Sequence, residues 1–83
     1  MAVFAKFAEC KKNGNTAHSD EAQALVKELQ NYITENYYTC TKEILAGLGL
    51  MYVADERFKT NIDKNGDGTA EFVSQAIENH IKS

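Results

Sequence analysis

The sequence predicts an all-α domain, a small compact bundle of about five short helices. Apolar residues recur every three or four positions in successive segments, which is the spacing that gives a helix one apolar face. No segment longer than a few residues alternates apolar and polar side chains as a half-buried strand does, and the chain has no proline. With 83 residues the chain is expected to form a single domain, residues 1–83, with a limited core.

The first two helices are expected on either side of an Asn-Gly-Asn sequence. Apolar residues from Val3 to Ala8 share one face of a short helix that ends near Lys12. Isolated helices of this length are marginal in water, so we expect this N-terminal arm to open more easily than the second helix. Ser19 or Asp20 caps the second helix. Its apolar stripe keeps helical spacing throughout and consists of Ala22, Leu25, Val26, Leu29 and Ile33.

A third helix is expected after the Asn-Tyr-Tyr sequence, with Thr39 or Thr41 as its cap. Gly47 and Gly49 lie inside this helix, where each glycine costs roughly 1 kcal/mol relative to alanine. Either close helix packing or the close approach of a ligand must therefore favour a small residue. The apolar side chains on one face are Ile44, Leu45, Leu48, Met51 and Tyr52.

Two more helices complete the predicted bundle. Asp55 is placed to cap a short fourth helix that presents Phe58 and Ile62. A glycine-rich turn then leads to the fifth helix, and we expect Asp67 to accept hydrogen bonds from its first amides. The apolar stripe of the fifth helix consists of Phe72, Val73, Ala76, Ile77 and Ile81.

The turn from Asp63 to Glu71, D-K-N-G-D-G-T-A-E, has a second interpretation as a calcium-binding EF-hand loop. Oxygen-bearing side chains occupy its first, third and fifth positions, and Gly68 occupies the sixth. The twelfth position requires a bidentate carboxylate but is Ser74, and one hydroxyl cannot supply two oxygens. We therefore expect an architectural turn and no metal site, and keep a calcium-binding, EF-hand-like helix pair as an alternative function.

Composition argues against several other classes. The formal charge is −3 and the longest basic cluster is Lys11-Lys12, so we expect no nucleic-acid binding by this chain alone. Cys10 and Cys40 lie far apart, without zinc-site spacing to each other or to the histidines, so we expect reduced thiols and no cofactor. No apolar run approaches the roughly 20 residues that span a bilayer. These features predict a cytoplasmic protein without membrane contact.

The sequence also lacks the usual patterns of a catalytic site. Asp55, Glu56 and Arg57 are adjacent, but neighbours one position apart on a helix do not face each other, so they form no carboxylate pair. There is no Ser/His/Asp ordering, no phosphate-binding glycine loop after a strand and no H-E-x-x-H motif. We therefore expect that the protein is not an enzyme.

Aromatic and sulfur-containing side chains are the candidates for ligand binding. Tyrosines combine an apolar face with a polar tip and methionine adapts its shape, a combination that suits large heteroaromatic compounds. At helical spacing the same residues are also typical of a hydrophobic core. Cys40 precedes the third helix, whose dipole would favour a thiolate there, and its alternative role is a small buried hydrophobe. The candidate binding residues are Tyr32, Tyr37, Tyr38, Cys40, Leu48, Met51, Tyr52 and Phe58.

Four segments, in order along the chain, carry a resemblance to a known family. They read D-E-A-Q-A-L-V from Asp20, N-Y-Y-T-C from Asn36, L-G-L-M-Y-V-A-D-E-R-F-K-T-N-I-D from Leu48 and G-T-A-E-F-V-S-Q-A-I from Gly68. Together they resemble the TipAS antibiotic-recognition domain, the ligand-binding half of drug-responsive MerR-family transcriptional activators. The resemblance implies a globin-like bundle, and we expect the family's most N-terminal helical segment to be missing here.

The resemblance also implies a ligand-sensing effector domain for hydrophobic multi-ring antibiotics or xenobiotics of the thiopeptide kind. In a full-length activator, binding would be coupled to transcription through a DNA-binding domain and a dimerising coiled coil that have no counterpart in this sequence. We therefore expect a dimer only in such a parent. A freestanding drug-sequestering resistance protein and an interaction domain without a small ligand are the alternatives. The founding member of the family binds covalently through a cysteine, whereas Gly47 occupies the matching position, so reversible binding is expected.

Overall fold

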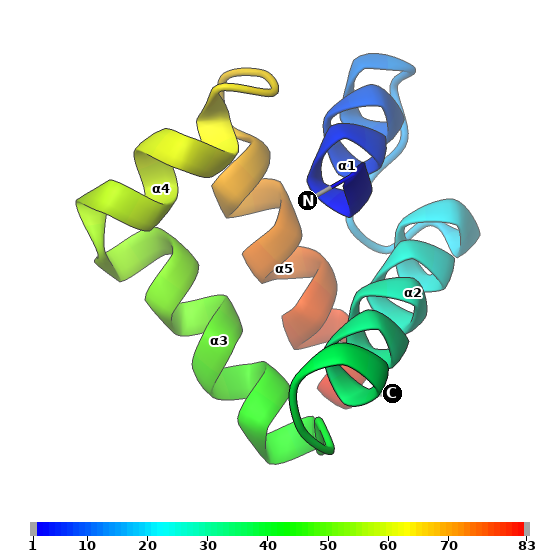
Figure 1. Ribbon diagram of the computed structural model, residues 1–83. Coiled ribbons are helices and arrows are strands. Elements are labelled where there is room, and N and C mark those ends of the chain that lie inside the picture. The colour runs from blue at the N-terminus through cyan, green and yellow to red at the C-terminus, as the bar shows by residue number, and fades with distance from the viewer. Residues whose placement is uncertain (1, 83) are drawn as a thin grey trace.

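The computed structural model describes residues 2–82, and these residues form the five predicted helices. Figure 1 shows their arrangement. The described residues contain no strand, so the expectation of an all-α bundle is confirmed. The helices are α1 (Ala2–Lys12), α2 (Asp20–Asn36), α3 (Lys42–Ala54), α4 (Glu56–Asp63) and α5 (Thr69–Lys82).

Helix α5 is the central element, because it packs against each of the other four helices. In Figure 1 the pair α3 and α4 lies on one side of α5 and the pair α1 and α2 lies on the other. The apolar stripe predicted for α5 is buried between the two pairs, except that Ile81 is only partly buried. This single core is therefore assembled around the last helix of the chain. The buried residues of α5 are Thr69, Ala70, Phe72, Val73, Ala76 and Ile77.

Three helices begin at the caps that the sequence predicts. In each case a side-chain oxygen accepts a hydrogen bond from a backbone N–H in the first turn and so satisfies a donor without an intrahelical partner. Ser19, Thr41 and Asp55 are the caps of α2, α3 and α4. The donors are Ala22 at 3.2 Å, Ile44 at 3.2 Å and Arg57 at 2.9 Å, respectively.

The predicted cap of α5 is wrong. It is the carboxylate of Asp63, at the end of α4, that accepts a hydrogen bond from the Ala70 N–H at 2.9 Å. The carbonyl of Asp67 instead accepts a hydrogen bond from the ammonium of Lys11 at 3.1 Å. Gly68 supplies the positive φ of 81° that the turn requires. The turn thus holds the start of α5 against α4 and α1.

Helix α1 is built into the core. Phe7 is completely buried, and Val3, Phe4 and Cys10 are buried on the same side of the helix. The ring of Phe7 packs against Phe72 of α5 at 6.3 Å. The short apolar stripe alone does not reveal how deeply α1 is covered; the expectation that this arm opens more easily than α2 stays a prediction.

Candidate ligand-binding site

A row of three aromatic rings joins α1, α3 and α4. Tyr52 of α3 lies edge-on to Phe4 of α1, with ring centroids 5.5 Å apart and planes at 89°. Tyr52 also contacts Phe58 of α4, with ring centroids 6.3 Å apart. Phe4 and Tyr52 are buried, whereas Phe58 is 42% exposed. The row therefore begins in the core and ends at the surface, which is the geometry of a stacking platform that a flat ligand can reach.

The α2–α3 loop brings Tyr38 and Cys40 next to Tyr52. Burial, together with smaller effects of the neighbouring Cys40 and Tyr38 groups, raises the pKa of the Tyr52 hydroxyl to about 12. Tyr52 is therefore neutral at physiological pH and its hydroxyl remains a hydrogen-bond donor. Tyr38 is 48% exposed, so it lies at the surface end of this group.

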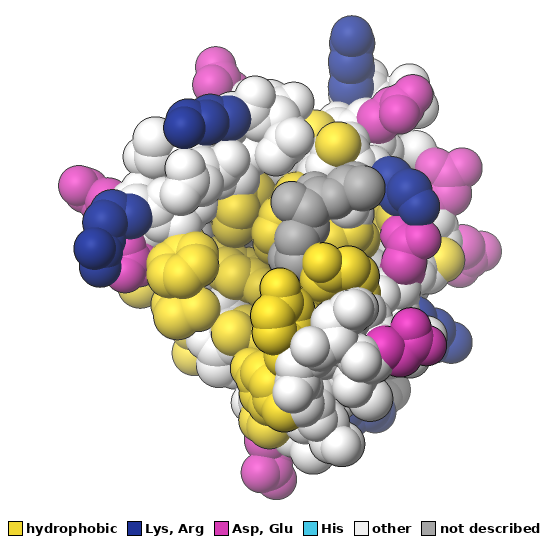
Figure 2. Space-filling view, viewed as in Figure 1, with side chains coloured by type: hydrophobic (Ala, Val, Ile, Leu, Met, Phe, Trp, Pro, Cys, Tyr) yellow, Lys and Arg dark blue, Asp and Glu magenta, His cyan; other side chains and the backbone are white. Residues whose placement is uncertain are grey.

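Half-buried apolar residues of α3 extend the aromatic surface. Ile44, Leu48 and Met51 are partly exposed and pack against the core. Figure 2, viewed as Figure 1, shows apolar side chains gathered in the middle of this face, with charged side chains around its edge. A ligand on this face would meet an apolar centre and a polar rim, as in most small-molecule sites.

The loop that carries Tyr38 is held to α2 by the hydrogen bond from the Tyr38 N–H to the Ile33 carbonyl at 3.1 Å and by two hydrogen bonds with side chains of α2. The Cys40 N–H donates to the Thr34 hydroxyl at 3.0 Å, and the Gln30 amide donates to the Cys40 carbonyl at 2.8 Å. Gln30 and Thr34 thus hold the backbone of the loop at Cys40, two residues after Tyr38. Their role is not evident from residue type, although Gln30 and Thr34 are one helical turn apart near the end of α2, which places both beside the loop that follows.

Of the two roles considered for Cys40, the structure favours the small buried hydrophobe over the reactive thiolate. Its side chain is buried, and burial raises the pKa of the thiol instead of lowering it. Desolvation therefore outweighs any effect of the nearby start of α3. Cys40 is therefore a small buried residue near Tyr52. Cys10 is also buried, and burial likewise raises the pKa of its thiol.

The predicted binding residues fall into two groups. One group surrounds Tyr52 and includes Tyr38, Cys40 and Phe58, with Leu48 and Met51 beside it on α3. The other group is a pair at the end of α2, where the rings of Tyr32 and Tyr37 lie 6.2 Å apart. Phe4 joins the first group, although the sequence placed it only in the apolar stripe of α1.

The two glycines of α3 have different surroundings. A Cβ atom on Gly49 would lie 3.2 Å from Cγ2 of Ile77, so the close packing of α3 on α5 explains this glycine. A Cβ atom on Gly47 would meet nothing within 4 Å. Packing therefore accounts for one glycine of α3 and leaves the other unexplained.

Polar groups of the turn between α4 and α5 form hydrogen bonds within the turn and with the start of α5. The Asp63 carboxylate caps α5, and the Thr69 hydroxyl donates to the Gly66 carbonyl. Within residues 2–82 there is no group of three or more His, Cys, Asp or Glu side chains placed to hold a metal ion.

No helix in this range is long and apolar enough to cross a membrane.

Comparison with known proteins identifies relatives along nearly the whole chain. The family model of the TipAS antibiotic-recognition domain matches residues 1–80. The HTH-type transcriptional activator mta of Bacillus subtilis (strain 168) is 36% identical over 76 residues, which cover 92% of this chain and 29% of the activator. The activator TipA of Streptomyces coelicolor is 36% identical over 72 residues, covering 87% of this chain and 28% of TipA. The chain therefore spans less than a third of these curated relatives.

A solved structure has the same fold. It is nosiheptide in complex with TipAS, from a thiopeptide antibiotic multidrug resistance system of Streptomyces lividans. The TM-score is 0.89 at 32% sequence identity, and the match covers 98% of this chain and 57% of the solved one. With the family model matching residues 1–80, the chain belongs to the TipAS antibiotic-recognition domain family.

Proposed function

We propose that this protein is a ligand-binding effector domain for hydrophobic multi-ring antibiotics of the thiopeptide kind. The observation that carries the proposal is its likeness to TipAS, whose solved complex contains the thiopeptide nosiheptide. The aromatic row from Phe4 to Phe58 and the half-buried apolar side of α3 supply a surface suited to such a compound. The domain acts by binding and not by catalysis.

The proposed site binds by stacking and apolar burial. Phe58 and Tyr38 present exposed ring faces for heteroaromatic rings, and Leu48 and Met51 supply adaptable apolar contacts. The Tyr38 hydroxyl, at the rim, is free to orient a polar group of the ligand. Gln30 and Thr34 act indirectly, since they hold the loop that positions Tyr38.

Binding is proposed to be reversible. A covalent bond to the ligand requires a thiolate at the surface, but the Cys40 and Cys10 thiols are buried and burial raises their pKa values. Gly47, on the open side of α3, has no nucleophilic side chain. We expect the intact mass of the denatured protein to be unchanged after incubation with nosiheptide. A protein mass increased by that of the ligand would contradict reversible binding.

Titration with nosiheptide, followed by amide NMR, tests the site directly. We expect shifts at Tyr38, Tyr52 and Phe58. Phe58→Ala should weaken binding by roughly tenfold or more, because an aromatic contact is worth about 0.5–1.5 kcal/mol beyond its buried area. Leu50→Ala is the matched control, since Leu50 is an exposed apolar residue of α3 outside this site. Absence of any shift near Tyr38 and Tyr52 would overturn the proposal.

The biological setting is proposed from the relatives. As part of a longer activator in the cytoplasm, the domain would couple ligand binding to transcription through a DNA-binding region on the same polypeptide, as the names of mta and TipA indicate for those proteins. As a freestanding protein it would instead sequester the drug. A reporter assay and a drug-protection assay in cells producing this chain alone distinguish the two, because sequestration protects without activating a promoter.

A further inference from the structure

The tripeptide Lys-Asn-Gly occurs twice in the chain, at residues 12–14 and 64–66. Asparagine is a thermolabile residue, and it deamidates most readily before glycine, which has no side chain to hinder attack by its backbone nitrogen on the asparagine amide. Because the residue before each asparagine is also the same, the local sequence predicts similar rates at the two sites. A large difference between them must therefore come from the structure.

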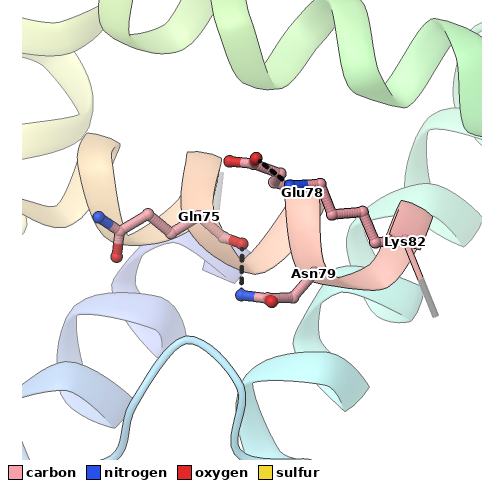
Figure 3. Close-up of polar contacts among 4 residues, drawn as sticks. All are labelled: Gln75, Glu78, Asn79 and Lys82. Carbon is pink, nitrogen blue, oxygen red and sulfur yellow. Dashed lines mark hydrogen bonds and ion pairs between the residues drawn. The ribbon is translucent and has the colours of Figure 1, made fainter.

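The side chain of Asn65 is held in place. Its amide donates a hydrogen bond to the Ile62 carbonyl at 3.1 Å. Asn79 makes a similar bond in α5, where its amide donates to the Gln75 carbonyl at 3.0 Å (Figure 3). An amide bound in this way must be released before its carbon atom can reach the next backbone nitrogen. The hydrogen bond of Asn65 therefore slows ring closure.

The backbone around Gly66 is held as well. The Gly66 N–H donates to the Asp63 carbonyl at 2.9 Å, and the Gly66 carbonyl accepts hydrogen bonds from the N–H and the hydroxyl of buried Thr69. A Cβ atom on Gly66 would lie 3.6 Å from the Cβ atom of Ala8 in α1. Ring closure at this site thus requires the turn to open against its own hydrogen bonds and its packing on α1.

Asn13 has fewer restraints. It is exposed just after α1, and its side chain makes no hydrogen bond within residues 2–82. Gly14 has a φ of 87°, and a Cβ atom there would meet nothing within 4 Å. The Gly14 N–H donates to the Lys11 carbonyl at 3.1 Å, but this bond lies at a helix end, where helices fray first. Of the two asparagines, Asn13 therefore reaches its neighbouring glycine more easily.

We propose that Asn13 is a site of spontaneous deamidation, in which its Cγ atom bonds to the Gly14 nitrogen. Hydroxide takes the proton from that nitrogen, the N–Cγ bond forms, and the Cγ–Nδ2 bond breaks as ammonia leaves with a proton from water. The succinimide ring then takes up one water molecule. Opening of the N–Cγ bond gives aspartate, and opening of the bond from nitrogen to the main-chain carbonyl carbon gives isoaspartate. The reaction consumes no oxidant and no cofactor.

The charge of either product is unfavourable at position 13. The new carboxylate stands at the C-terminal end of α1, which is the negative end of the helix dipole. It also shares a surface depression with Glu9 and Glu21. Lys6 lines the same depression but already pairs with Glu28 at 2.8 Å, and the adjacent Lys12 offsets only part of the repulsion.

Isoaspartate also disturbs the cap of α1. Two hydrogen bonds cross position 13, from the Gly14 N–H to the Lys11 carbonyl at 3.1 Å and from the Asn15 N–H to the Cys10 carbonyl at 3.2 Å. Isoaspartate lengthens the main chain by one carbon atom inside both hydrogen-bonded loops, so neither bond keeps its geometry. We therefore expect the aged protein to melt at a lower temperature than the fresh protein.

The first test compares the two sites by mass spectrometry. The folded protein is kept at mildly alkaline pH and sampled over time, and fragment ions of its tryptic peptides locate the mass increase at each asparagine. We expect Asn13 to react roughly tenfold faster than Asn65, because opening about one net hydrogen bond more at Asn65 corresponds to a factor of this order. Equal rates in the folded protein, or a faster reaction at Asn65, overturn the proposal.

The same measurement in urea is the matched control. The unfolded chain presents two nearly identical sequences, so both asparagines should then react at similar rates. If the unfolded chain shows the same preference for Asn13 as the folded protein, local sequence and not the structure sets the rate, and the proposal is wrong.

The second test reads the consequence for α1. In Asn13→Gln the amide is kept but closes a larger ring far more slowly, so the melting temperature of this variant should stay constant during ageing while that of the wild type falls. Asn65→Gln leaves the reactive site in place and should age as the wild type does. A wild-type protein that melts unchanged after Asn13 has been converted overturns the proposed weakening of α1. Neither test uses a ligand, so the outcome is independent of the proposed antibiotic binding.

Discussion

The two helix pairs that flank α5 use their apolar residues in different ways. In the pair α1 and α2, Phe7, Val26 and Leu29 are completely enclosed. In the pair α3 and α4, Leu50 and Phe58 are exposed, and Leu48 and Met51 are only half-buried. The first pair buries most of its apolar surface in the core, whereas the second leaves more of its apolar surface exposed to solvent. Apolar spacing along a helix therefore does not by itself separate core from binding surface.

The sharpest test of this difference compares two phenylalanines. Phe7→Ala should lower the free energy of unfolding by about 3–5 kcal/mol, because it leaves a cavity where the ring was fully enclosed. Phe58→Ala should cost about 1 kcal/mol or less, since much of that ring is already in water. Urea unfolding followed by circular dichroism measures both values. Equal losses in the two variants would show that α4 belongs to the core as fully as α1.

The two glycines of α3 give a second, smaller test. Gly47→Ala should raise the free energy of unfolding by up to about 1 kcal/mol, because alanine favours the helix and meets nothing. In Gly49→Ala the new methyl presses on buried Ile77, which cancels or reverses that gain. Thermal melts compare the two. A larger gain at Gly49 than at Gly47 would contradict the close packing of α3 on α5.

The smallest expected effect lies where the two pairs meet at the end of α5. Burial lowers the pKa of His80, and Lys42 of α3 and Lys27 of α2 lower it further. The unfolded chain therefore takes up this proton first as pH falls, and stability present above the ordinary histidine pKa is lost as pH drops through the folded pKa. Melting temperatures measured from roughly pH 7 to roughly pH 5 should fall less in His80→Asn than in the wild type. His18→Asn, at an exposed loop position, is the control and should change this slope less.

Much of the fold follows from local signals in the sequence. Ser19, Thr41 and Asp55 cap their helices because the interaction spans only two or three residues. The cap of α5 was assigned to Asp67 instead of Asp63 because the path of the turn, which folds Asp63 back onto Ala70, is set by tertiary packing.

The candidate site was only partly predictable for a similar reason. Tyr38, Tyr52 and Phe58 were selected by residue type, and the structure brings them together. Phe4 was missed, because its position beside Tyr52 depends on how α1 packs against a helix far along the chain. The depth at which Cys40 is buried, which reverses the expected direction of its pKa shift, also depends on such packing.

The central place of α5 has a consequence for how the protein is made. Helix α5 leaves the ribosome after all four of the helices that pack against it. Until residues 69–82 emerge, the apolar stripes of α1 to α4 lack their common partner, and short helices without a partner are marginal in water. Residues 2–68 must therefore remain largely unfolded during translation, and the domain folds as one unit after α5 has emerged. A premature stop codon before position 69 would consequently yield an unfolded chain for proteolysis, not a smaller working domain.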